Sequence, residues 1–261
     1  MLSDPRSEKV KGISKLNQKD ARYDTGLFLL EGFQGLREVI EHQDLIEEVL
    51  ATEQALEAHP ELFDRLPAQP TLVSERVMDK IADTRTPQGV VTIAHQLDVD
   101  IDLVVSNKPK LVAILDQIRD PGNAGTILRA ADAAGADAVI FSKESVDLYN
   151  PKVVRSTAGS LFHLPIVIEA DLSVALAKLS AAGLQIFAAA GSGESILGVQ
   201  ELSKPTAWVF GNEAHGVSKD LMDLADKVVA LPIYGAAESL NLATAASVCL
   251  YQSAFSQNPS R

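Results

Sequence analysis

The chain has 261 residues, with 23 Lys and Arg against 35 Asp and Glu, and a formal net charge of −12 at pH 7. This balance excludes a protein coated in basic surface, and a hydrophobic content of 46% is ample for a core. No apolar run approaches the roughly 20 residues of a membrane span, so no membrane partner is expected. The single cysteine, Cys249, excludes an intrachain disulfide, and the five histidines show no metal-ligand spacing. With no hydrophobic signal region at residues 1–16, a cytoplasmic protein is expected.

Residues 1–98 are predicted to form a small α/β domain. Apolar runs and turn residues predict strands at 26–30, 45–50, 71–74 and 89–94. Helical patterns lie between them at 32–41, 53–63 and 75–81. Residues 99–109 are acidic and then polar with a proline, which is typical of a linker to a second domain at 110–261.

The first 22 residues are the most basic stretch of an acidic chain, with six basic side chains against three acidic ones. One interpretation is a solvated N-terminal helix. The other is a local binding surface for an anionic polymer. For the second, the candidate contacts are Lys9, Lys11, Lys15, Lys19 and Arg22.

The second domain alternates strand and helix patterns. Strands are predicted at 111–115, 138–141, 164–168, 184–189, 207–210 and 227–231. Helices are predicted at 123–134 with Asn123 as cap, from Pro151, at 172–182, and after Ser239 as cap. Such alternation predicts a mostly parallel sheet with helices on both faces, and ligands beyond the carboxyl ends of its strands.

Three polar clusters follow predicted strands in this domain. The first runs from Asn123 to Arg129, the second is a glycine-bounded loop around Glu213, and the third ends in Ser239-Leu-Asn241. Each alone has an ordinary explanation: a capped helix with a solvated arginine, a turn, and a turn before a core helix. Their shared position at strand ends favours a ligand site.

In combination the clusters read NxGxxxR, GNExxG and LPxxGxxxSLN, with RSTAGS at 155–160 as a fourth match. They resemble the motifs of the SpoU/TrmH family, which are RNA ribose 2′-O-methyltransferases of the SPOUT superfamily. The resemblance covers residues 111 to about 255. The N-terminal domain is similar, through LFLLEG at 27–32 and TPQGV at 86–90, to the L30e-like RNA-binding domain found in that family.

The resemblance implies an α/β fold whose C-terminal parallel-sheet domain, 110–261, contains a trefoil knot and follows an L30e-like domain. It implies S-adenosylmethionine as cofactor and a homodimer whose sites are completed across the interface. The cofactor-binding residues implied are Ala189, Ala190, Gly191, Gly211, Asn212, Gly216, Leu231, Ile233, Ser239 and Leu240.

The resemblance also implies catalytic roles. Arg129 matches the family's catalytic arginine. Because a guanidinium is a poor base, contact with phosphate and stabilisation of alkoxide charge are favoured over a role as base. Asn123 and Asn241 are expected to hold the loops and the hydroxyl, Ser239 to orient the nucleotide or Arg129, and Glu213 to orient Arg129. Arg155 is an added candidate RNA contact.

Ribosomal RNA is the expected substrate, because the extra N-terminal domain resembles proteins that hold structured RNA. Two alternatives stay open. One is a transfer RNA methyltransferase. The other is a non-catalytic RNA-binding protein with the same fold, against which the complete set of motif residues argues.

Overall fold

The computed structural model describes residues 1–196 and 201–259. Its contacts divide the chain into two compact units. Unit 1 comprises Met1–Leu97 and Asp147–Phe162, and unit 2 comprises Asp98–Val146 and His163–Arg261. The segment at 147–162, which the sequence assigned to the second domain, therefore packs with the first.

Unit 1 is built on a four-stranded mixed sheet in the order β1-β4-β2-β3. The strands are β1 (Leu27–Glu31), β2 (Ile46–Ala51), β3 (Thr71–Leu72) and β4 (Val90–His95). β4 is antiparallel to both β1 and β2, and β3 is parallel to β2. The helices are α1 (Glu8–Lys15), α2 (Lys19–Thr25), α3 (Gly32–Val39), η1 (Ile40–Leu45), α4 (Glu53–Ala58), α5 (Pro60–Phe63), α6 (Glu75–Ile81), α9 (Pro151–Ser156) and η2 (Ser160–Phe162).

The helix predicted at 53–63 is two helices, α4 and α5. The break is at His59, whose backbone is neither helical nor extended (φ −140°, ψ 54°). Proline disfavours helical geometry in the residue before it, and Pro60 follows His59 directly. Pro60 instead begins α5, where its missing N–H leaves no bond unmade.

The basic N-terminal segment is part of the core of unit 1, not a solvated helix. Val10, Ile13 and Leu16 are buried against residues of α6 and the sheet. Arg22, a candidate RNA contact, is only 2% exposed. Its guanidinium donates to the Asp147 carboxylate and to the Leu16 carbonyl, so Arg22 is a structural residue.

The segment at 147–162 is fixed to the rest of unit 1 by packing and charge. The ring of Tyr149 lies 4.8 Å from that of Phe28 on β1. Arg155, another candidate RNA contact, donates to Glu31 at 3.2 Å and to Asp83 at 2.8 Å. Two carboxylates neutralise this guanidinium within unit 1, so contact of Arg155 with RNA stays a prediction.

Unit 2 is built on a six-stranded parallel sheet in the order β10-β8-β9-β5-β6-β7. Its strands are β5 (Leu111–Leu115), β6 (Ala138–Ser142), β7 (Ile166–Ala170), β8 (Gln185–Ser195), β9 (Thr206–Phe210) and β10 (Lys227–Ala230). Its helices are α7 (Ile101–Ser106), α8 (Pro121–Ala133), α10 (Leu172–Ala181), α11 (Lys219–Leu224) and α12 (Leu242–Gln257).

The predicted linker at 99–109 is largely structured. It contains α7, whose Val104 is buried in the core of unit 2, while the N–H of Val99 donates to the Ile166 carbonyl at 2.8 Å. Asp and aliphatic residues alternate here without a helical period, so the sequence did not predict this helix of 6 residues.

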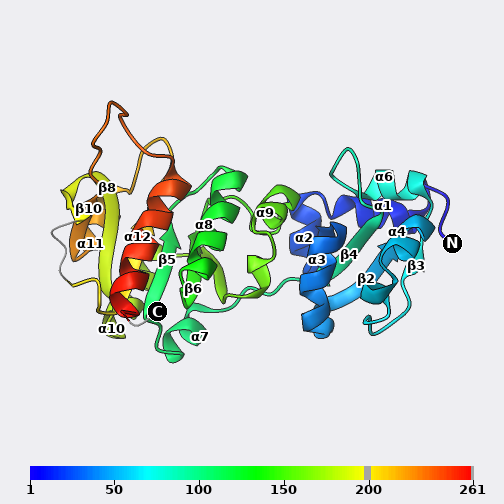
Figure 1. The fold of residues 1–261 in the computed structure, drawn as a ribbon, viewed down its shortest axis with the longest axis horizontal. Coiled ribbons are helices and arrows are strands. Elements are labelled where there is room, and N and C mark those ends of the chain that lie inside the picture. The colour runs from blue at the N-terminus through cyan, green and yellow to red at the C-terminus, as the bar shows by residue number, and fades with distance from the viewer. Residues whose placement is uncertain (197–200, 260–261) are drawn as a thin grey trace. The chain divides into compact units, whose positions relative to one another are not determined.

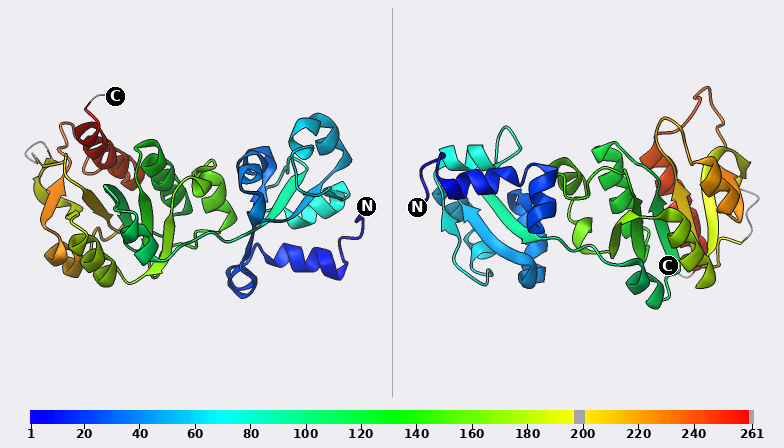
Figure 2. Two further views of the ribbon diagram at one scale, coloured as in Figure 1. Left: turned by 90° about the horizontal axis from the view of Figure 1, so that it is seen from below. Right: turned by 180° about the vertical axis from the view of Figure 1, so that it is seen from behind.

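Helices cover both faces of the parallel sheet, as Figures 1 and 2 show. α8 and α12 pack on each other and on the central strands, and α7, α10 and α11 cover the opposite face. From edge strand β10 the chain returns across β9 to α12 (Figure 1). This parallel sheet with helices on both faces agrees with the α/β fold that the motif resemblance implied. No helix among the described residues is long and apolar enough to cross a membrane.

The buried pair of Arg22 and Asp147 predicts a stability effect. We expect Arg22→Ala to destabilise unit 1 by about 3–5 kcal/mol, because it leaves the Asp147 carboxylate buried without its partner. Lys11→Ala, which removes an exposed pair with Glu8, is the control and should change stability little. Urea unfolding followed by circular dichroism measures both. A double variant Arg22→Ala/Asp147→Ala that costs the full sum of the single losses would contradict the coupling.

Candidate active site

Helix α8 begins at the carboxyl edge of the parallel sheet with Asp120 as its N-cap. The Asp120 carboxylate accepts the Asn123 N–H at 2.7 Å, and Pro121 occupies the first helical position. Asn123 therefore lies in the first turn and is not the cap that the sequence suggested. Its side chain is left to make contacts outside the helix.

Helix α12 begins with Asn241, not Ser239, as its N-cap. The Asn241 side-chain oxygen accepts the N–H groups of Ala243 at 2.9 Å and Thr244 at 3.2 Å. Ser239 lies two residues earlier, in the segment between β10 and α12. The same amide group of Asn241 that caps the helix also reaches α8 through its nitrogen.

Three of the motif residues form one chain of hydrogen bonds. Asn241 Nδ2 donates to Asn123 Oδ1 at 3.0 Å, and Asn123 Nδ2 donates to Glu213 Oε1 at 3.2 Å. The starts of α8 and α12 and the loop after β9 are thereby joined at one edge of the sheet. This contact is the observation that turns three separate sequence clusters into one site.

Glu213 binds the start of α8, and among the described residues of one protomer it makes no hydrogen bond or ion pair with Arg129. Its carboxylate accepts the backbone N–H groups of Asp120 at 3.2 Å and Arg119 at 3.4 Å. Partial burial acts to raise the pKa of Glu213, but hydrogen bonds from the backbone and from Asn123 outweigh it, so the pKa lies below its usual value. The carboxylate stays ionised at neutral pH and holds the loop in place.

Arg129 is exposed on α8, and it lines neither cavity of the site described below. Six residues along a helix correspond to about 9 Å of rise, so Arg129 and Asn123 are separated along α8. Within residues 1–196 and 201–259 its guanidinium makes no ion pair, and the expected partner Glu213 is bound elsewhere. One protomer thus does not bring Arg129 to the other motif residues.

Two adjoining cavities lie against the hydrogen-bonded chain, of about 190 and 620 Å³. The smaller is lined by Ala189, Ala190, Gly191, Val229, Leu231, Ile233, Glu238, Ser239, Leu240, Ala245 and Cys249. The larger adds Asn123, Ser192, Gly211, Asn212, Glu213, His215, Gly216, Val217, Met222, Asn241 and Leu242. Every residue that the motifs implied for the cofactor lines one of the two. Sequence reasoning missed Ala245 and Cys249, although they follow the Asn241 cap at helical spacing.

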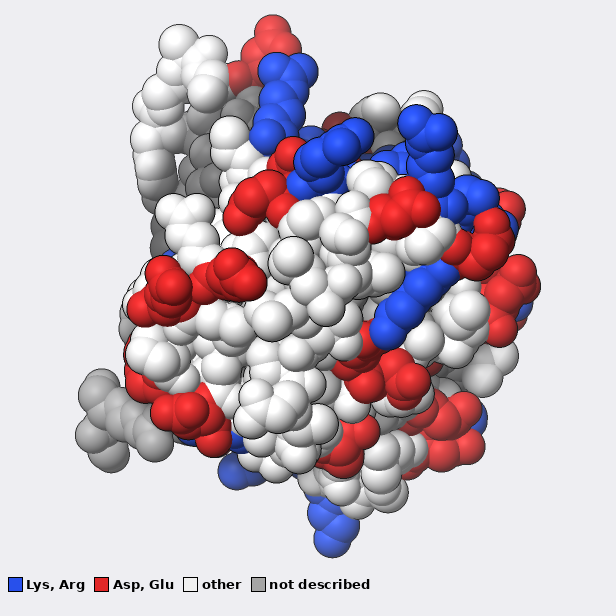
Figure 3. Space-filling view, turned by 90° about the vertical axis from the view of Figure 1, so that its right-hand side faces the viewer, with Lys and Arg blue, Asp and Glu red and all other residues white. Residues whose placement is uncertain are grey.

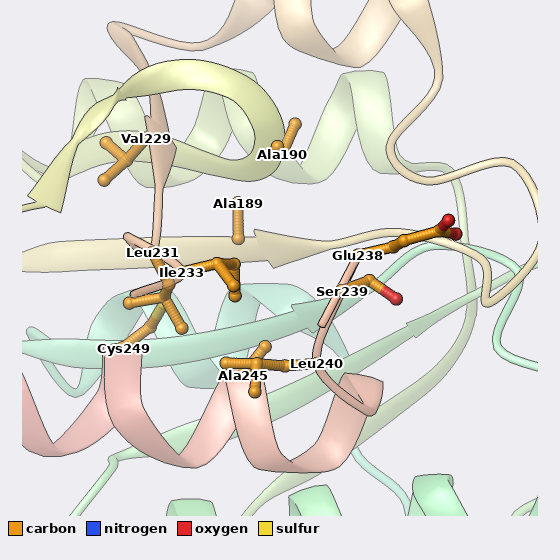
Figure 4. A pocket seen from close by; sticks show the side chains of 11 residues that line it. Ala189, Ala190, Val229, Leu231, Ile233, Glu238, Ser239, Leu240, Ala245 and Cys249 are labelled. Carbon is orange, nitrogen blue, oxygen red and sulfur yellow. The ribbon is translucent and has the colours of Figure 1, made fainter. Parts of the chain in front are cut away.

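The smaller cavity is apolar at one end and polar at the other. Figure 4 shows Leu231, Ile233 and Cys249 close to one another, with the oxygens of Glu238 and Ser239 at the far end. Burial raises the pKa of the Cys249 thiol to about 12, so it is a neutral wall group and not a nucleophile. A ligand with a flat apolar ring and a polar tail fits this distribution.

Two glycines of the cavities have different functions. A Cβ on Gly211 would lie 2.0 Å from the backbone of Gly216, so Gly211 is required by its own loop. A bulky residue there would disrupt the loop and would not simply fill the ligand space. At Gly191 nothing lies within 4 Å of a built Cβ, so this position opens directly into the cavity.

Comparison with known proteins explains this arrangement. Residues 110–251 match the SpoU rRNA Methylase family. The chain belongs to this family. Residues 7–92 match the MRM3-like substrate binding domain. The activity of the chain is that of an RNA ribose 2′-O-methyltransferase that uses S-adenosylmethionine.

Three relatives resemble nearly the whole chain. A Bacillus subtilis protein named 23S rRNA (guanosine(2553)-2′-O)-methyltransferase RlmP is 32% identical over 96% of this chain and 97% of its own length. The AdoMet-bound rRNA methyltransferase of Sinorhizobium meliloti has a TM-score of 0.83 and 31% identity, covering 99% and 97% of the two chains. The SpoU methyltransferase AviRb of Streptomyces viridochromogenes, in complex with AdoMet, has a TM-score of 0.86 and 27% identity, covering 97% and 100%.

The open space at Gly191 provides a steric test of cofactor binding. We expect Gly191→Leu to fold normally and to weaken S-adenosylmethionine binding by at least about 100-fold, since a side chain there occupies the cavity. Calorimetry of cofactor binding measures the effect. Gly12→Leu, at an equally open but distant position on α1, is the matched control and should bind normally. Unchanged affinity in Gly191→Leu would place the cofactor elsewhere.

Proposed function

We propose that this protein methylates the 2′-hydroxyl of one nucleotide in 23S ribosomal RNA. The hydrogen-bonded chain of Glu213, Asn123 and Asn241 beside two connected cavities is the observation that carries the proposal. The similarity to RlmP over nearly the full length of both chains supports the large-subunit RNA as substrate. The match of residues 7–92 to a substrate-binding domain supports a role for unit 1 in holding that RNA.

The cavities have apolar walls that fit S-adenosylmethionine. Their glycine and alanine residues have little or no side chain, so the cofactor can reach the protein backbone there. Leu231, Ile233 and Leu240 would enclose the adenosine, and residues 189–191 would border it. Bound there, the cofactor supplies an electrophilic sulfonium methyl group. Asn123 and Asn241 would position the ribose, since their amides are already fixed by the chain of hydrogen bonds.

A non-catalytic RNA-binding protein is the weaker alternative. Such a protein needs no cavity lined by the cofactor residues that the motifs implied, and the structure joins three motif residues by direct contacts. A transfer RNA substrate is less favoured. Residues 7–92 match a substrate-binding domain, and RlmP, which is named a 23S rRNA methyltransferase, aligns with this chain over nearly the full length of both.

A homodimer is supported by the exposed surface of α12. Val248, Tyr251 and Phe255 recur at spacings of three and four and are 39%, 36% and 65% exposed. The rings of Tyr251 and Phe255 pack on each other, with centroids 5.5 Å apart. Such an apolar stripe is typical of an interface. A dimer would also let Arg129 of one protomer complete the site of the other, where it would bind phosphate and stabilise alkoxide charge.

Two neighbouring helices of unit 1, α1 and α6, carry basic side chains that remain available for RNA. Ser14 and Asn17 at the end of α1 donate to the carbonyls of Lys80 and Ile81 at 3.1 and 2.8 Å, so the two helices are in contact. Within the described ranges, Lys15, Arg76 and Lys80 are exposed without an ion pair. These three residues, here called the α1/α6 patch, would contact phosphates. Figure 3 shows Lys and Arg side chains gathered at one edge of a molecular face.

The lysines that the sequence predicted as RNA contacts differ in whether their ammonium groups already have a partner. Lys9 pairs with Glu48 at 2.6 Å and Lys11 with Glu8 at 2.7 Å, while the Lys19 ammonium lies over the Tyr23 ring. We keep all three as secondary contacts, because exposed ion pairs exchange readily for phosphate. Lys15 is the one shared with the α1/α6 patch.

Arg129 provides the test of the catalytic proposal. We expect Arg129→Ala to retain fold and cofactor affinity, because the side chain is exposed, and to lower methyl transfer by at least about 100-fold. Arg129→Lys should fail similarly if a planar two-pronged grip is required. Single-turnover assays on a 23S rRNA transcript measure the loss.

Mixing the Arg129→Ala and Gly191→Leu proteins tests whether sites are shared. If Arg129 acts across a dimer interface, mixed dimers contain one complete site, and about a quarter of wild-type activity should return at equal concentrations. Continued inactivity of the mixture, with exchange of subunits verified, would place Arg129 in the site of its own protomer or outside the mechanism.

The α1/α6 patch predicts the salt dependence of RNA binding. Deletion of residues 1–22 would remove Val10, Ile13 and Arg22 from the core, so point variants are the better probe. We expect Lys15→Ala/Arg76→Ala/Lys80→Ala to weaken RNA binding and lower the salt slope by roughly two to three units, with cofactor affinity unchanged.

The matched control is Arg65→Ala, which removes an exposed arginine that lies outside α1 and α6. Filter binding across a salt series should give this control a slope close to that of the wild type. A triple variant with an unchanged slope would show that RNA is held by another surface.

A further inference from the structure

Asp116 is a buried carboxylate that the reaction described above does not use. It follows the last residue of β5 and is only 6% exposed. Within the described part of the chain, its carboxylate accepts one hydrogen bond, from the Ser218 N–H at 3.4 Å. Burial raises the pKa of this carboxyl, against the opposing effect of the Ser218 N–H. Buried carboxylates usually have several donors, so Asp116 has acceptor capacity left unused.

The Asp116 carboxyl lines a third cavity of about 370 Å³, which lies within the size range of small-molecule sites. Its other lining residues are Gln117, Arg119, Asn212, Ala214, His215, Gly216 and Ser218. Asn212, His215 and Gly216 also line the larger cavity of the active site, so the two spaces adjoin across the loop after β9. A ligand group in this third cavity would therefore lie next to the proposed ribose site.

Hydrogen bonds hold the residues around Asp116 in place. Gln117 has a left-handed backbone (φ 51°), which is uncommon for a side chain of this kind. Its N–H donates to Ser142 Oγ at 2.7 Å, and its carbonyl accepts from Asn212 Nδ2 at 2.8 Å. The Asp116 N–H donates to the Phe210 carbonyl at 2.8 Å. These bonds hold the carboxylate at the cavity without satisfying it.

We propose that this cavity receives the base of the methylated nucleotide, and that Asp116 selects guanine by accepting its N1–H and N2–H₂ groups. The inference rests on the proposed function, because it assigns the adjoining cavity to the target ribose. A base displaced from its stack presents its Watson–Crick edge, which is how proteins that act on single nucleotides identify them.

Guanine is the base whose Watson–Crick edge matches a carboxylate. Two adjacent N–H donors of guanine face the two carboxylate oxygens, and charge assistance makes such a pair strong. Adenine and cytosine each place an acceptor nitrogen beside their amino group, and uracil flanks its one N–H with two carbonyls. These acceptors would face the buried carboxylate of Asp116 without a shared proton, which is unfavourable.

The exposed residues of the cavity provide the remaining contacts. His215 and Arg119 carry flat groups of the kind on which unstacked bases lie. The guanidinium of Arg119 is 3.9 Å from the Glu144 carboxylate, a long contact between two exposed side chains. Arg119 is therefore available to move onto a base or its phosphate.

Saturation-transfer NMR with the full-length protein tests the selection directly. The probes are the 5′-monophosphates of guanosine, adenosine, cytidine and uridine, with excess S-adenosylhomocysteine to fill the adenosine cavity. We expect guanosine monophosphate to bind at least about 10-fold more tightly than the others, and Asp116→Asn to lose that preference by a similar factor.

Two further variants distinguish recognition from folding. Ala214→Leu adds bulk to an exposed position that lines only this cavity and should exclude all four nucleotides. Asp223→Asn removes an exposed carboxylate on α11, outside the cavity, and should bind like the wild type. Equal binding of the four nucleotides, no binding of any, or unchanged guanosine monophosphate affinity in Asp116→Asn would each overturn the inference.

Failure of this inference can be distinguished from failure of the proposed function. If the wild type selects guanosine monophosphate but leaves a 23S rRNA transcript unmethylated, the assignment of the cavity stands and the RNA substrate is wrong. If the transcript is methylated while the four nucleotides bind equally, the methyltransferase assignment stands and Asp116 does not read the base.

Discussion

The contact of Asn123 with both Glu213 and Asn241 is the constraint on which the site depends. Each of these residues is attached to a different part of unit 2: the start of α8, the loop after β9 and the start of α12. An amide has a donor and an acceptor end, so Asn123 can serve a carboxylate on one side and another amide on the other. Replacement by aspartate would keep the size but place two acceptors against Glu213. The residue type is therefore dictated by its two partners, and the cavities form where the three segments meet.

Charge pairs explain why the two units do not follow the linear order of the chain. Asp147 belongs by sequence to the family match at 110–251, but its carboxylate neutralises Arg22 inside unit 1. A buried arginine without that partner would be strongly unfavourable, so the segment at 147–162 must be present for unit 1 to be stable. Gly159 reinforces this: its backbone has φ 102°, and a Cβ there would lie 2.6 Å from the Glu38 side chain. The RSTAGS motif thus contributes to packing of the N-terminal unit, a function that differs from contact with RNA.

The sequence predicted elements well where apolar periodicity is local and failed where partners are distant. α6 and β5 have the predicted bounds, because their buried faces recur at regular spacing. α7 and α11 were not predicted, since short helices depend on packing more than on their own pattern. Motif resemblance found the cavity residues, but it could not show that Arg22 pairs with a residue 125 positions away. It also could not show that Glu213 binds the start of α8, because a motif gives the residue types of a site without their contacts.

In an acidic protein that binds RNA, the residues that attract phosphate must differ from those that select the base. The net charge of −12 repels a polyanion on average, so affinity has to come from local cations such as the α1/α6 patch, whose effect decays within a Debye length of about 8 Å. Carboxylates near the reacting nucleotide would then repel its phosphate, unless each is paired with a cation or accepts hydrogen bonds. Glu213 is used by backbone N–H groups, and Arg22 and Arg155 each neutralise carboxylates of unit 1. Asp116 is the buried exception, with one long hydrogen bond. A negative group kept beside an RNA site repels phosphate and favours a ligand edge rich in N–H donors, so its position selects the base while the patch supplies the affinity.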